Sequence, residues 1–263
     1  MSNLKSALAR LDRDYLAGSL KHGYHLLGNS IAKIAIARHH RLNWDIRHSK
    51  DEQSILAKLC EVHGSDKGWL FKSGKPFRGR PHTYTDLYEF MFSHCRKNVR
   101  RVFECGLGTN NPNVRSNMGE GGRPGASLRV WRDYFPNAQI VGVDIDSTVL
   151  FTEDRISTFQ LDQTSRDSVL AFWTGLDGSS FDLMVDDGLH EFHAGICLFE
   201  NSIDHLSADG VYVIEDVLPF DRIKYSRYFD SLTDRFTVHV IDLHERNKFL
   251  VDNSLILIRR KAA

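Results

Sequence analysis

The sequence contains few cysteines, few prolines and no apolar run long enough to cross a membrane. Its 263 residues include 4 Cys, with no C-x-x-C pair, and 6 Pro. Scattered cysteines and the absence of a recognisable signal peptide predict a reduced, cytoplasmic chain. The most apolar stretch near the N-terminus, residues 24–37, is shorter than the roughly 20 residues that a membrane-spanning helix needs. No transmembrane helix is therefore predicted.

The chain also lacks a net charge, but the two signs are unevenly distributed. In total, 34 Lys and Arg balance 34 Asp and Glu, and 41% of the residues are apolar, which fits one ordinary domain or a domain with an appendage. Residues 1–101 contain 19 basic and 9 acidic residues, whereas residues 102–263 contain 15 and 25. Parts of such different charge usually have different roles. We therefore expect a basic accessory segment beside an acidic domain.

The first hundred residues are expected to be mainly helical. Apolar residues recur at helical spacing through residues 1–62, for example at Leu4, Leu8 and Leu11 and again at Ile55, Leu56 and Leu59. Residues 63–85 lose this periodicity and form a predicted basic loop that contains Lys67, Lys72, Lys75, Arg78 and Arg80. Residues 86–95 are again helical in pattern. Residues 1–100 are thus predicted to be a helical N-terminal accessory segment.

From residue 101 onward, short apolar runs alternate with helical segments, which is typical of an α/β fold around a parallel sheet. Strands are predicted at 101–105, 139–143, 157–161, 181–185, 210–214, 236–241 and 254–259. A clear helix between the first two strands should begin at Ser127 and stop at Pro136. The last two runs have no helix-length segment between them, so they are predicted to form a hairpin with one antiparallel strand. Residues 101–263 are therefore predicted to form one domain around a seven-stranded, mostly parallel sheet.

A glycine-rich turn follows the first of these strands, at Glu104-Cys-Gly-Leu-Gly108. Glycines there let the backbone approach a bound cofactor. The third glycine of a dinucleotide fingerprint would fall at Asn111, and the long loop 110–126 precedes the helix, so a pyrophosphate site is not expected. Asp144 ends the second strand, and Asp162-Gln163 follow the third. These acceptors suit a nucleoside without phosphates, although a purely structural turn is the alternative.

Three carboxylates follow the fourth and fifth strands of the domain. Asp187 and the Glu215-Asp216 pair should lie close together, because neighbouring parallel strands end at the same edge of a sheet. Such carboxylates repel one another unless a cation lies among them. Oxygen ligands favour Mg²⁺, with Mn²⁺ or Ca²⁺ as substitutes. The alternatives are a structural acidic network, and an Asp187 that only caps the next helix or forms an Asp-Gly turn.

His190 lies three residues after Asp187 and can face the same cavity. An imidazole with a pKa near neutrality is suited to remove a proton from a hydroxyl group. His193 is the competing candidate, about one helical turn further along. A purely structural histidine is the third possibility.

Together these segments resemble class I S-adenosylmethionine-dependent methyltransferases. The similarity is greatest to metal-dependent sugar O-methyltransferases of the macrocin and mycinamicin type, and it covers residues 101–260. It is carried by Glu-Cys-Gly-Leu-Gly at 104–108 and by Gly-Ala-Ser-Leu-Arg-Val-Trp-Arg-Asp-Tyr-Phe-Pro-Asn-Ala at 125–138. It is also carried by the segments 143–146, 181–190 and 211–216, which read Val-Asp-Ile-Asp, Phe-Asp-Leu-Met-Val-Asp-Asp-Gly-Leu-His and Val-Tyr-Val-Ile-Glu-Asp.

The resemblance implies a Rossmann-like methyltransferase fold and a site for each ligand. The implied cofactor-binding residues for S-adenosylmethionine are Glu104, Gly106, Gly108, Ser127, Asp144, Asp162 and Gln163. The implied Mg²⁺ ligands, with Mn²⁺ as a possible substitute, are Asp187, Glu215 and Asp216. His190 would be the general base that removes the proton from an acceptor sugar hydroxyl. The resemblance further implies a small-molecule or glycan acceptor and a homo-oligomer.

Other functions remain open from sequence alone. A nicotinamide-dependent oxidoreductase is disfavoured by the missing third glycine and by the terminal hairpin. A non-catalytic nucleoside-binding subunit would not need Asp187, His190, Glu215 and Asp216 together. A nucleic-acid methyltransferase is a minor alternative, because no RNA-binding motif accompanies the basic residues. The acceptor is not identified, although Trp69, His82, Tyr84 and Tyr88 could line its pocket; for Tyr88, packing in the core is preferred.

Overall fold

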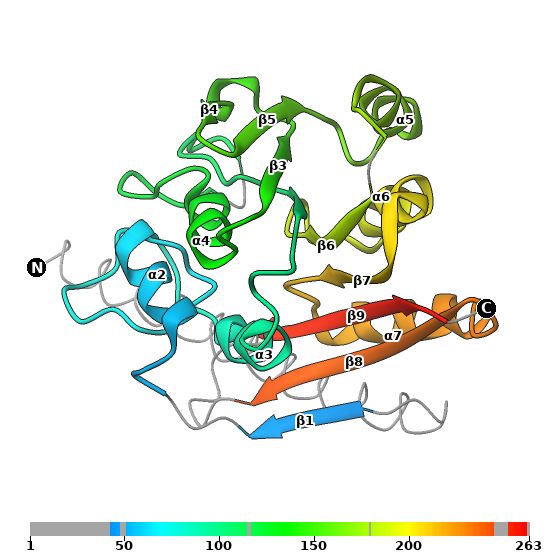
Figure 1. Cartoon of the computed structure of the whole chain (residues 1–263), viewed down its shortest axis with the longest axis horizontal. Coiled ribbons are helices and arrows are strands. Elements are labelled where there is room, and N and C mark those ends of the chain that lie inside the picture. The colour runs from blue at the N-terminus through cyan, green and yellow to red at the C-terminus, as the bar shows by residue number, and fades with distance from the viewer. Residues whose placement is uncertain (1–42, 48–50, 115–116, 179, 245–251, 262–263) are drawn as a thin grey trace, which may run out of the picture.

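The structure is a computed structural model that describes residues 43–47, 51–114, 117–178, 180–244 and 252–261. The described chain forms a nine-stranded sheet with the order β1-β8-β9-β7-β6-β2-β3-β5-β4 (Figure 1). The strands are β1 (Asn43–Arg47), β2 (Arg101–Cys105), β3 (Gln139–Asp144), β4 (Thr152–Glu153), β5 (Ile156–Gln160), β6 (Phe181–Asp186), β7 (Leu206–Ile214), β8 (Phe236–His244) and β9 (Ser254–Arg260). The α-helices are α2 (Ile55–His63), α3 (Tyr84–Phe92), α4 (Ala126–Tyr134), α5 (Arg166–Gly175), α6 (Phe192–Ser202) and α7 (Pro219–Asp230), with short 3-10 turns η1 (Ser147–Val149) and η2 (Ile203–His205).

The seven predicted strands form the centre of this sheet. Strands β5, β3, β2, β6 and β7 are parallel neighbours, and β9 runs antiparallel to both β7 and β8. This confirms the predicted α/β architecture with its antiparallel C-terminal hairpin. Two short edge strands were not expected. β4 pairs with β5, and β1 pairs in parallel with β8, so residues 43–47 form a strand rather than the predicted helix.

Helices cover both faces of the sheet. Because side chains alternate across a strand, Val102 packs with one face and Phe103 with the other. The first face is covered by α2, α3 and α4, and the second by α5, α6 and α7. The carboxyl ends of the parallel strands therefore open between two packed layers, which is where ligands bind in open α/β sheets.

The described part of the first hundred residues packs into the same core. Leu56 and Cys60 of α2, and Tyr84 and Tyr88 of α3, belong to the hydrophobic cluster that contains the sheet residues. Helix α2 confirms the helical pattern at residues 55–59, whereas the predicted helices over residues 1–42 lie outside the described residues. The division into a 1–100 segment and a 101–263 domain stays a prediction. Among the described residues, none of the helices has the length and apolarity to span a membrane.

The predicted helix after β2 is present, but it begins differently. It starts at Ala126 after Gly125, which has φ +71, and the side chain of Ser127 makes no capping hydrogen bond. Ser127 instead donates from Oγ to Glu104 Oε1 at 2.6 Å. The helix ends before Pro136, as expected.

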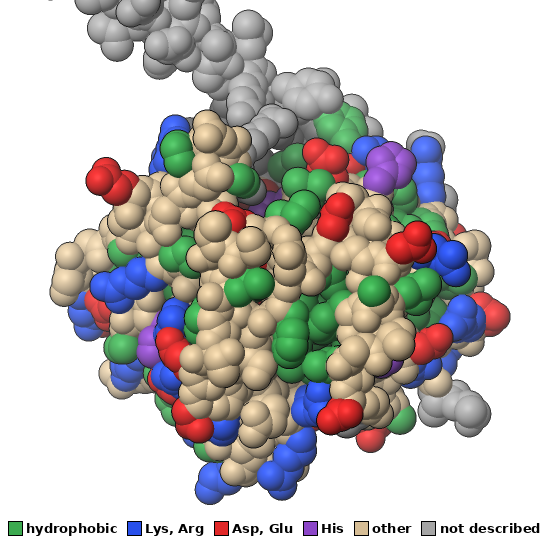
Figure 2. Space-filling view, turned by 90° about the horizontal axis from the view of Figure 1, so that it is seen from above, with side chains coloured by type: hydrophobic (Ala, Val, Ile, Leu, Met, Phe, Trp, Pro, Cys, Tyr) green, Lys and Arg blue, Asp and Glu red, His purple; other side chains and the backbone are tan. Residues whose placement is uncertain are grey.

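Charged side chains of both signs are interspersed on the face that Figure 2 shows. The difference in charge between the two parts of the sequence therefore does not appear there as two separate fields of opposite sign.

Candidate active site

One pocket lies at the carboxyl ends of β2, β3, β5, β6 and β7. Its lining combines the turn after β2, the residues after β3 and β5, and the loop after β6. Of the predicted cofactor-binding residues, the pocket is lined by Gly106, Gly108, Ser127, Asp144, Asp162 and Gln163; Asp187, His190 and Asp216 line it as well. The sheet thus brings most of the predicted site residues into one cavity.

The glycine turn after β2 passes close to other parts of the site. Gly106 has φ +98 and Gly108 has φ +77, a conformation that favours glycine. A Cβ at Gly106 would collide with the backbone carbonyl of Asp187, and one at Gly108 would collide with the thioether of Met118. Any larger residue at either position would therefore clash with the loop after β6 or with Met118, so the turn requires glycine at both positions.

Two predicted acidic residues present carboxylates to the pocket and are held by local hydrogen bonds. Asp144 accepts from the backbone N–H groups of Leu107 at 2.8 Å and Asp146 at 2.9 Å. Asp162 Oδ1 accepts from the backbone N–H and the hydroxyl of Thr164. Both side chains are thereby oriented before any ligand binds.

Gln163 and Glu104 have different surroundings from those predicted. Gln163 is buried, accepts from the N–H of Leu189 at 2.7 Å and donates to Asp186 Oδ1 at 3.1 Å, so its amide joins the loops after β5 and β6. Glu104 is fully buried and is not among the residues that line the pocket. It accepts from Ser127 and from the indole N–H of Trp131. Glu104 therefore lies behind the pocket wall and does not face the cavity.

The three predicted metal-binding carboxylates do lie together, but a lysine lies among them. Lys67, from the predicted basic loop, donates from Nζ to Asp187 Oδ2 at 2.5 Å and to Glu215 Oε2. Its Nζ is also 3.4 Å from Glu104 Oε1. Burial opposes the charged forms, yet these carboxylates raise the pKa of Lys67 above its ordinary value, and Lys67 holds the pKa of Asp187 well below its usual range. A permanent ammonium group therefore neutralises part of the cluster.

His190 lies in the loop between β6 and α6 and faces the pocket. Its Nε2 is 3.2 Å from Asp187 Oδ1 and 3.4 Å from Asp216 Oδ2. Burial disfavours the charged imidazole, but Asp216 and Asp187 outweigh it and raise the pKa of His190 to about 10. His190 and Asp216 both have positive φ values, +59 and +54, a strained conformation for residues other than glycine.

The structure removes two alternatives at this site. His193, the competing base, is exposed on α6 and is not among the residues that line the pocket. Asp187 does not cap α6, since the N-cap position is Glu191 and no side-chain capping bond is made there.

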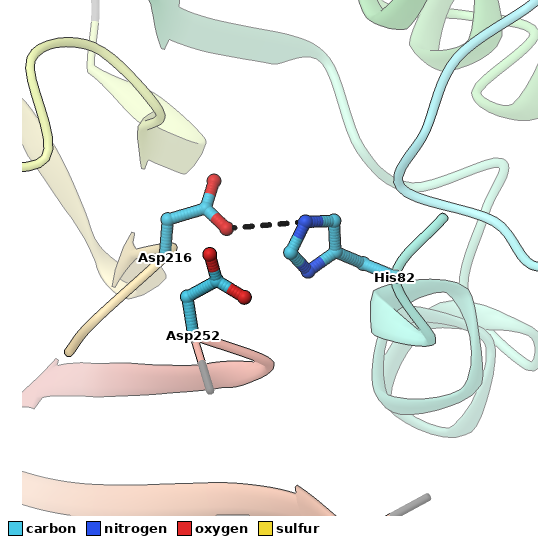
Figure 3. A group of neighbouring side chains, drawn as sticks. All are labelled: His82, Asp216 and Asp252. Atoms are coloured by element: carbon cyan, nitrogen blue, oxygen red, sulfur yellow. Dashed lines mark ion pairs between the residues drawn. The ribbon is translucent and has the colours of Figure 1, made fainter. Parts of the chain in front are cut away.

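A second group of side chains meets Asp216 from the other side (Figure 3). His82 Nε2 is 3.3 Å from Asp216 Oδ1, and Asp252 completes a group whose ligand atoms lie within 4.8 Å of one another. Tyr84 donates its hydroxyl to Asp216 Oδ1 at 2.9 Å and to the carbonyl of Asp252 at 3.0 Å. Asp216 is therefore held between two imidazoles, of His82 and His190.

Sequence reasoning did not place Lys67 in the site, and it considered His82 and Tyr84 only as possible lining of the acceptor pocket, not as partners of Asp216. All three lie in residues 63–85, which the sequence assigned to a basic loop. The only available signal was the cluster of carboxylates itself, which required a positive charge without saying whether a metal or a distant lysine supplies it. Tyr88 is buried as preferred; its hydroxyl donates to Glu215 Oε1 at 2.6 Å.

The donor set on the pocket side of the cluster fits a hard divalent cation. Oxygen atoms of Asp187 and Asp216 and a nitrogen of His190 lie within 4.8 Å of one another in the described chain. Carboxylate oxygens at the edge of an open pocket leave room for water and for acceptor oxygens, which Mg²⁺ requires. Glu215 is not part of this group.

No family model matches the chain. Several curated proteins are similar to it, including the following two. The 8-demethyl-8-(2-methoxy-alpha-L-rhamnosyl)-tetracenomycin-C 3'-O-methyltransferase of Streptomyces olivaceus is 33% identical over 172 residues, which are 65% of this chain and 39% of that protein. The mycinamicin VI 2''-O-methyltransferase of Micromonospora griseorubida is 34% identical over 143 residues, 54% of this chain and 33% of that protein. The chain thus spans between a third and two fifths of the length of these relatives.

A solved structure shows the same fold. It is the MycE methyltransferase from the mycinamycin biosynthetic pathway, in complex with Mg, SAH and mycinamycin VI; its TM-score is 0.55 at 24% sequence identity, covering 78% of this chain and 54% of that one. The described chain therefore shares the fold of that protein. Over about two thirds of its length, the chain is related in sequence to sugar O-methyltransferases.

Proposed function

We propose that this chain, which resembles sugar O-methyltransferases in sequence and class I methyltransferases in fold, is an S-adenosylmethionine-dependent O-methyltransferase that acts on a sugar hydroxyl. One observation carries the proposal: a single pocket joins the glycine turn and Asp144 to Asp187, His190 and Asp216. The first group suits a nucleoside cofactor, and the second suits activation of a hydroxyl.

In this proposal the cofactor lies along the ends of β2, β3 and β5. The backbone of Gly106 and Gly108 passes beneath the methionine part, and both glycines line the pocket. Asp144 accepts hydrogen bonds from the ribose hydroxyls, and Asp162 lies beside the adenine. Gln163 acts indirectly, because its amide is already bonded to Leu189 and Asp186. Glu104 and Ser127 support the turn from behind.

Mg²⁺, or Mn²⁺ in its place, would be held by the carboxylates of Asp187 and Asp216, and when bound it would make an acceptor hydroxyl more acidic. Both side chains line the pocket and offer oxygen atoms on the same side of the cluster. The third ligand expected from sequence, Glu215, is already bonded to Lys67 and Tyr88.

His190 is the proposed general base. The methyl group leaves the sulfonium as the S–C bond breaks, an O–C bond forms to the acceptor oxygen, and the hydroxyl proton passes to Nε2 of His190. Because the methyl group of a sulfonium is already activated, alignment of the acceptor oxygen with the S–C bond is the main task of the pocket. The carboxylates of Asp187 and Asp216 orient the imidazole and raise its pKa to about 10, so the neutral form that accepts the proton would be populated once a divalent cation on these carboxylates opposes their charge.

The proposed acceptor is a glycoside, a polysaccharide precursor or a natural-product sugar. One of the similar proteins is named as a 3'-O-methyltransferase of a rhamnosyl tetracenomycin C, and the other as a 2''-O-methyltransferase of mycinamicin VI. We also propose a cytoplasmic location, which the four free cysteines support, and a homo-oligomer, which sedimentation of the purified chain would test.

The experiment is a screen of sugar, nucleotide-sugar and glycoside acceptors with S-adenosylmethionine that carries a labelled methyl group. The proposal predicts transfer of label to at least one sugar hydroxyl. Label transfer only to nucleic acid would contradict the proposed acceptor class.

A further inference from the structure

Lys67 is a buried cation that contacts three carboxylates from three different strands. Its side chain is only 3% exposed. Glu104 is in β2, Asp187 follows β6 and Glu215 follows β7. Placing an ammonium group in the interior is costly unless it is paired on several sides. Lys67 meets this condition, since its Nζ has carboxylate oxygens of all three residues as neighbours.

The backbone around Lys67 is fixed by hydrogen bonds. Helix α2 ends at Gly64, which has φ +83, and the chain then turns toward the sheet. The carbonyl of Lys67 accepts from the N–H of Thr85 at 3.2 Å, and the carbonyl of Asp66 accepts from the N–H of His82 at 2.7 Å. The loop thereby connects α2 to α3 with the lysine held at the centre of the cluster.

Glu215 has both oxygens engaged within the interior. Oε1 accepts from the hydroxyl of Tyr88, and Oε2 accepts from Lys67. The side chain is fully buried and does not line the pocket that contains the glycine turn; it lines only a small cavity on the other side of His190 and Asp216. A cation that enters from the pocket therefore meets Asp187 and Asp216 first, with Glu215 behind them.

Asp187 is shared between the two sides. Its Oδ2 faces Lys67, while Oδ1 faces His190 and the pocket. Asp216 presents Oδ2 to the same imidazole and Oδ1 to His82. One oxygen of each aspartate thus remains on the side where a divalent cation and an acceptor would bind.

We infer that Lys67 is a positioning residue that serves as a built-in counter-ion for Glu215, so that the divalent cation is bound by Asp187 and Asp216 and Glu215 is not a ligand. This inference rests on the proposed function, because it concerns the cation which that function requires. It changes the ligand set expected from sequence and gives a role to a residue of the basic loop.

The test is calorimetric titration of Mn²⁺ into the full chain and its variants. Lys67→Met combined with Glu215→Gln removes both charges together, so that neither is left buried without its partner. We expect this double variant to bind Mn²⁺ within about threefold of the wild type, whereas Asp216→Asn should lose more than about tenfold, as expected for loss of a ligand. Equal losses in the two variants would overturn the inference.

The single variant Lys67→Met provides a second measurement. Without the ammonium group competing for Asp187, Mn²⁺ affinity should rise by at least about threefold, since removing a nearby positive charge favours a cation. Lys72→Met is the matched control, because Lys72 belongs to the same loop but is exposed and pairs with Glu52 on the surface. An unchanged or lower affinity in Lys67→Met would contradict the inference.

These results distinguish failure of the proposed function from failure of the inference about Lys67. If the wild-type chain binds Mn²⁺ and the double variant does not, the proposed function stands and the inference fails. If the wild-type chain does not bind Mn²⁺, the metal part of the proposed function fails and the inference fails with it.

Discussion

Two residues of the pocket, His190 and Asp216, adopt left-handed backbone conformations although neither is glycine. Such conformations cost about 1–3 kcal/mol each and persist only where the surroundings enforce them. Here they bring the imidazole against Asp187 Oδ1 and Asp216 Oδ2. Both residues lie in the part of the pocket where we place the proton transfer; Arg155, with φ +57, is the other described non-glycine residue in this conformation and lies outside the pocket.

His190→Ala should lower turnover by about 100-fold or more, which is typical of losing a general base. Binding of S-adenosylmethionine should be unchanged, because the cofactor contacts are assigned to other residues. Labelled methyl transfer measures the first quantity and calorimetry the second. His193→Ala is the control, since this side chain is exposed on α6. Near-normal turnover in His190→Ala would reject the assignment.

At the scale of the elements, the turn from β2 toward α4 contacts the backbone of two other segments of the site. Gly106 donates its N–H to Val143 at 2.8 Å and lies against the carbonyl of Asp187. The three segments that follow β2, β3 and β6 are therefore packed backbone to backbone. A change in this turn would therefore also affect the loop after β6, where we place the divalent cation.

Gly106→Ala should lower the free energy of unfolding by at least about 1 kcal/mol, because φ is positive and the new methyl group meets a backbone atom. It should also weaken binding of S-adenosylmethionine. Thermal unfolding and calorimetry measure the two effects. Gly175→Ala is the matched control, since nothing lies within 4 Å of its added Cβ. Equal stability of the two variants would count against the close approach seen at Gly106.

His205 gives a pH-dependent prediction for η2. Its ring stacks on Trp173 of α5 at 4.0 Å, and burial lowers its pKa below the ordinary value of 6.5. The unfolded chain therefore binds this proton more readily than the folded chain. The contribution to stability is complete above about pH 6.5 and falls as the solution is acidified below that pH.

Two measurements test this prediction. The pKa of His205 from NMR titration should lie below 6.5, and the free energy of unfolding of His205→Phe should fall less steeply with acidification than that of the wild type. A pKa of His205 at or above 6.5 would contradict the effect of burial.

The seven central strands of the sheet followed from the sequence, because each carried its own apolar pattern and the short connection before the last strand required a hairpin, whereas the edge strands β1 and β4 did not. The pocket residues followed as well, since ends of parallel strands meet at one edge. Lys67 and His82 could not be placed in this way. Their approach to Asp187 and Asp216 depends on how α2 and α3 pack across the sheet, and no local spacing encodes that packing.

The same reasoning explains why β1 was missed. Residues 43–47 read Asn-Trp-Asp-Ile-Arg, a segment too short and too polar to indicate a strand without the edge of β8 beside it. The unequal charge of residues 1–101 and 102–263 likewise does not predict where individual charges lie in the fold. At least one of the basic charges of residues 1–101, that of Lys67, lies inside the acidic cluster and does not contribute to a basic surface.

Removal of divalent cations should abolish activity of the whole chain. With an acceptor from the screen, EDTA should stop methyl transfer, and excess Mg²⁺ or Mn²⁺ should restore it, because Asp187 and Asp216 would otherwise present only carboxylates to the acceptor. Binding of S-adenosylmethionine serves as the control for an intact fold. Turnover that continues undiminished in EDTA would show that the acidic cluster has no metal role.

The central claim is that the pocket at the ends of β2, β3 and β5 binds S-adenosylmethionine. Calorimetric titration of the full chain with S-adenosylmethionine, and separately with NAD, tests it most directly. We predict saturable binding of S-adenosylmethionine at one site, weakened by about tenfold or more in Asp144→Asn through the loss of a charged hydrogen-bond acceptor, and no binding of NAD. Binding of NAD without binding of S-adenosylmethionine would contradict the account.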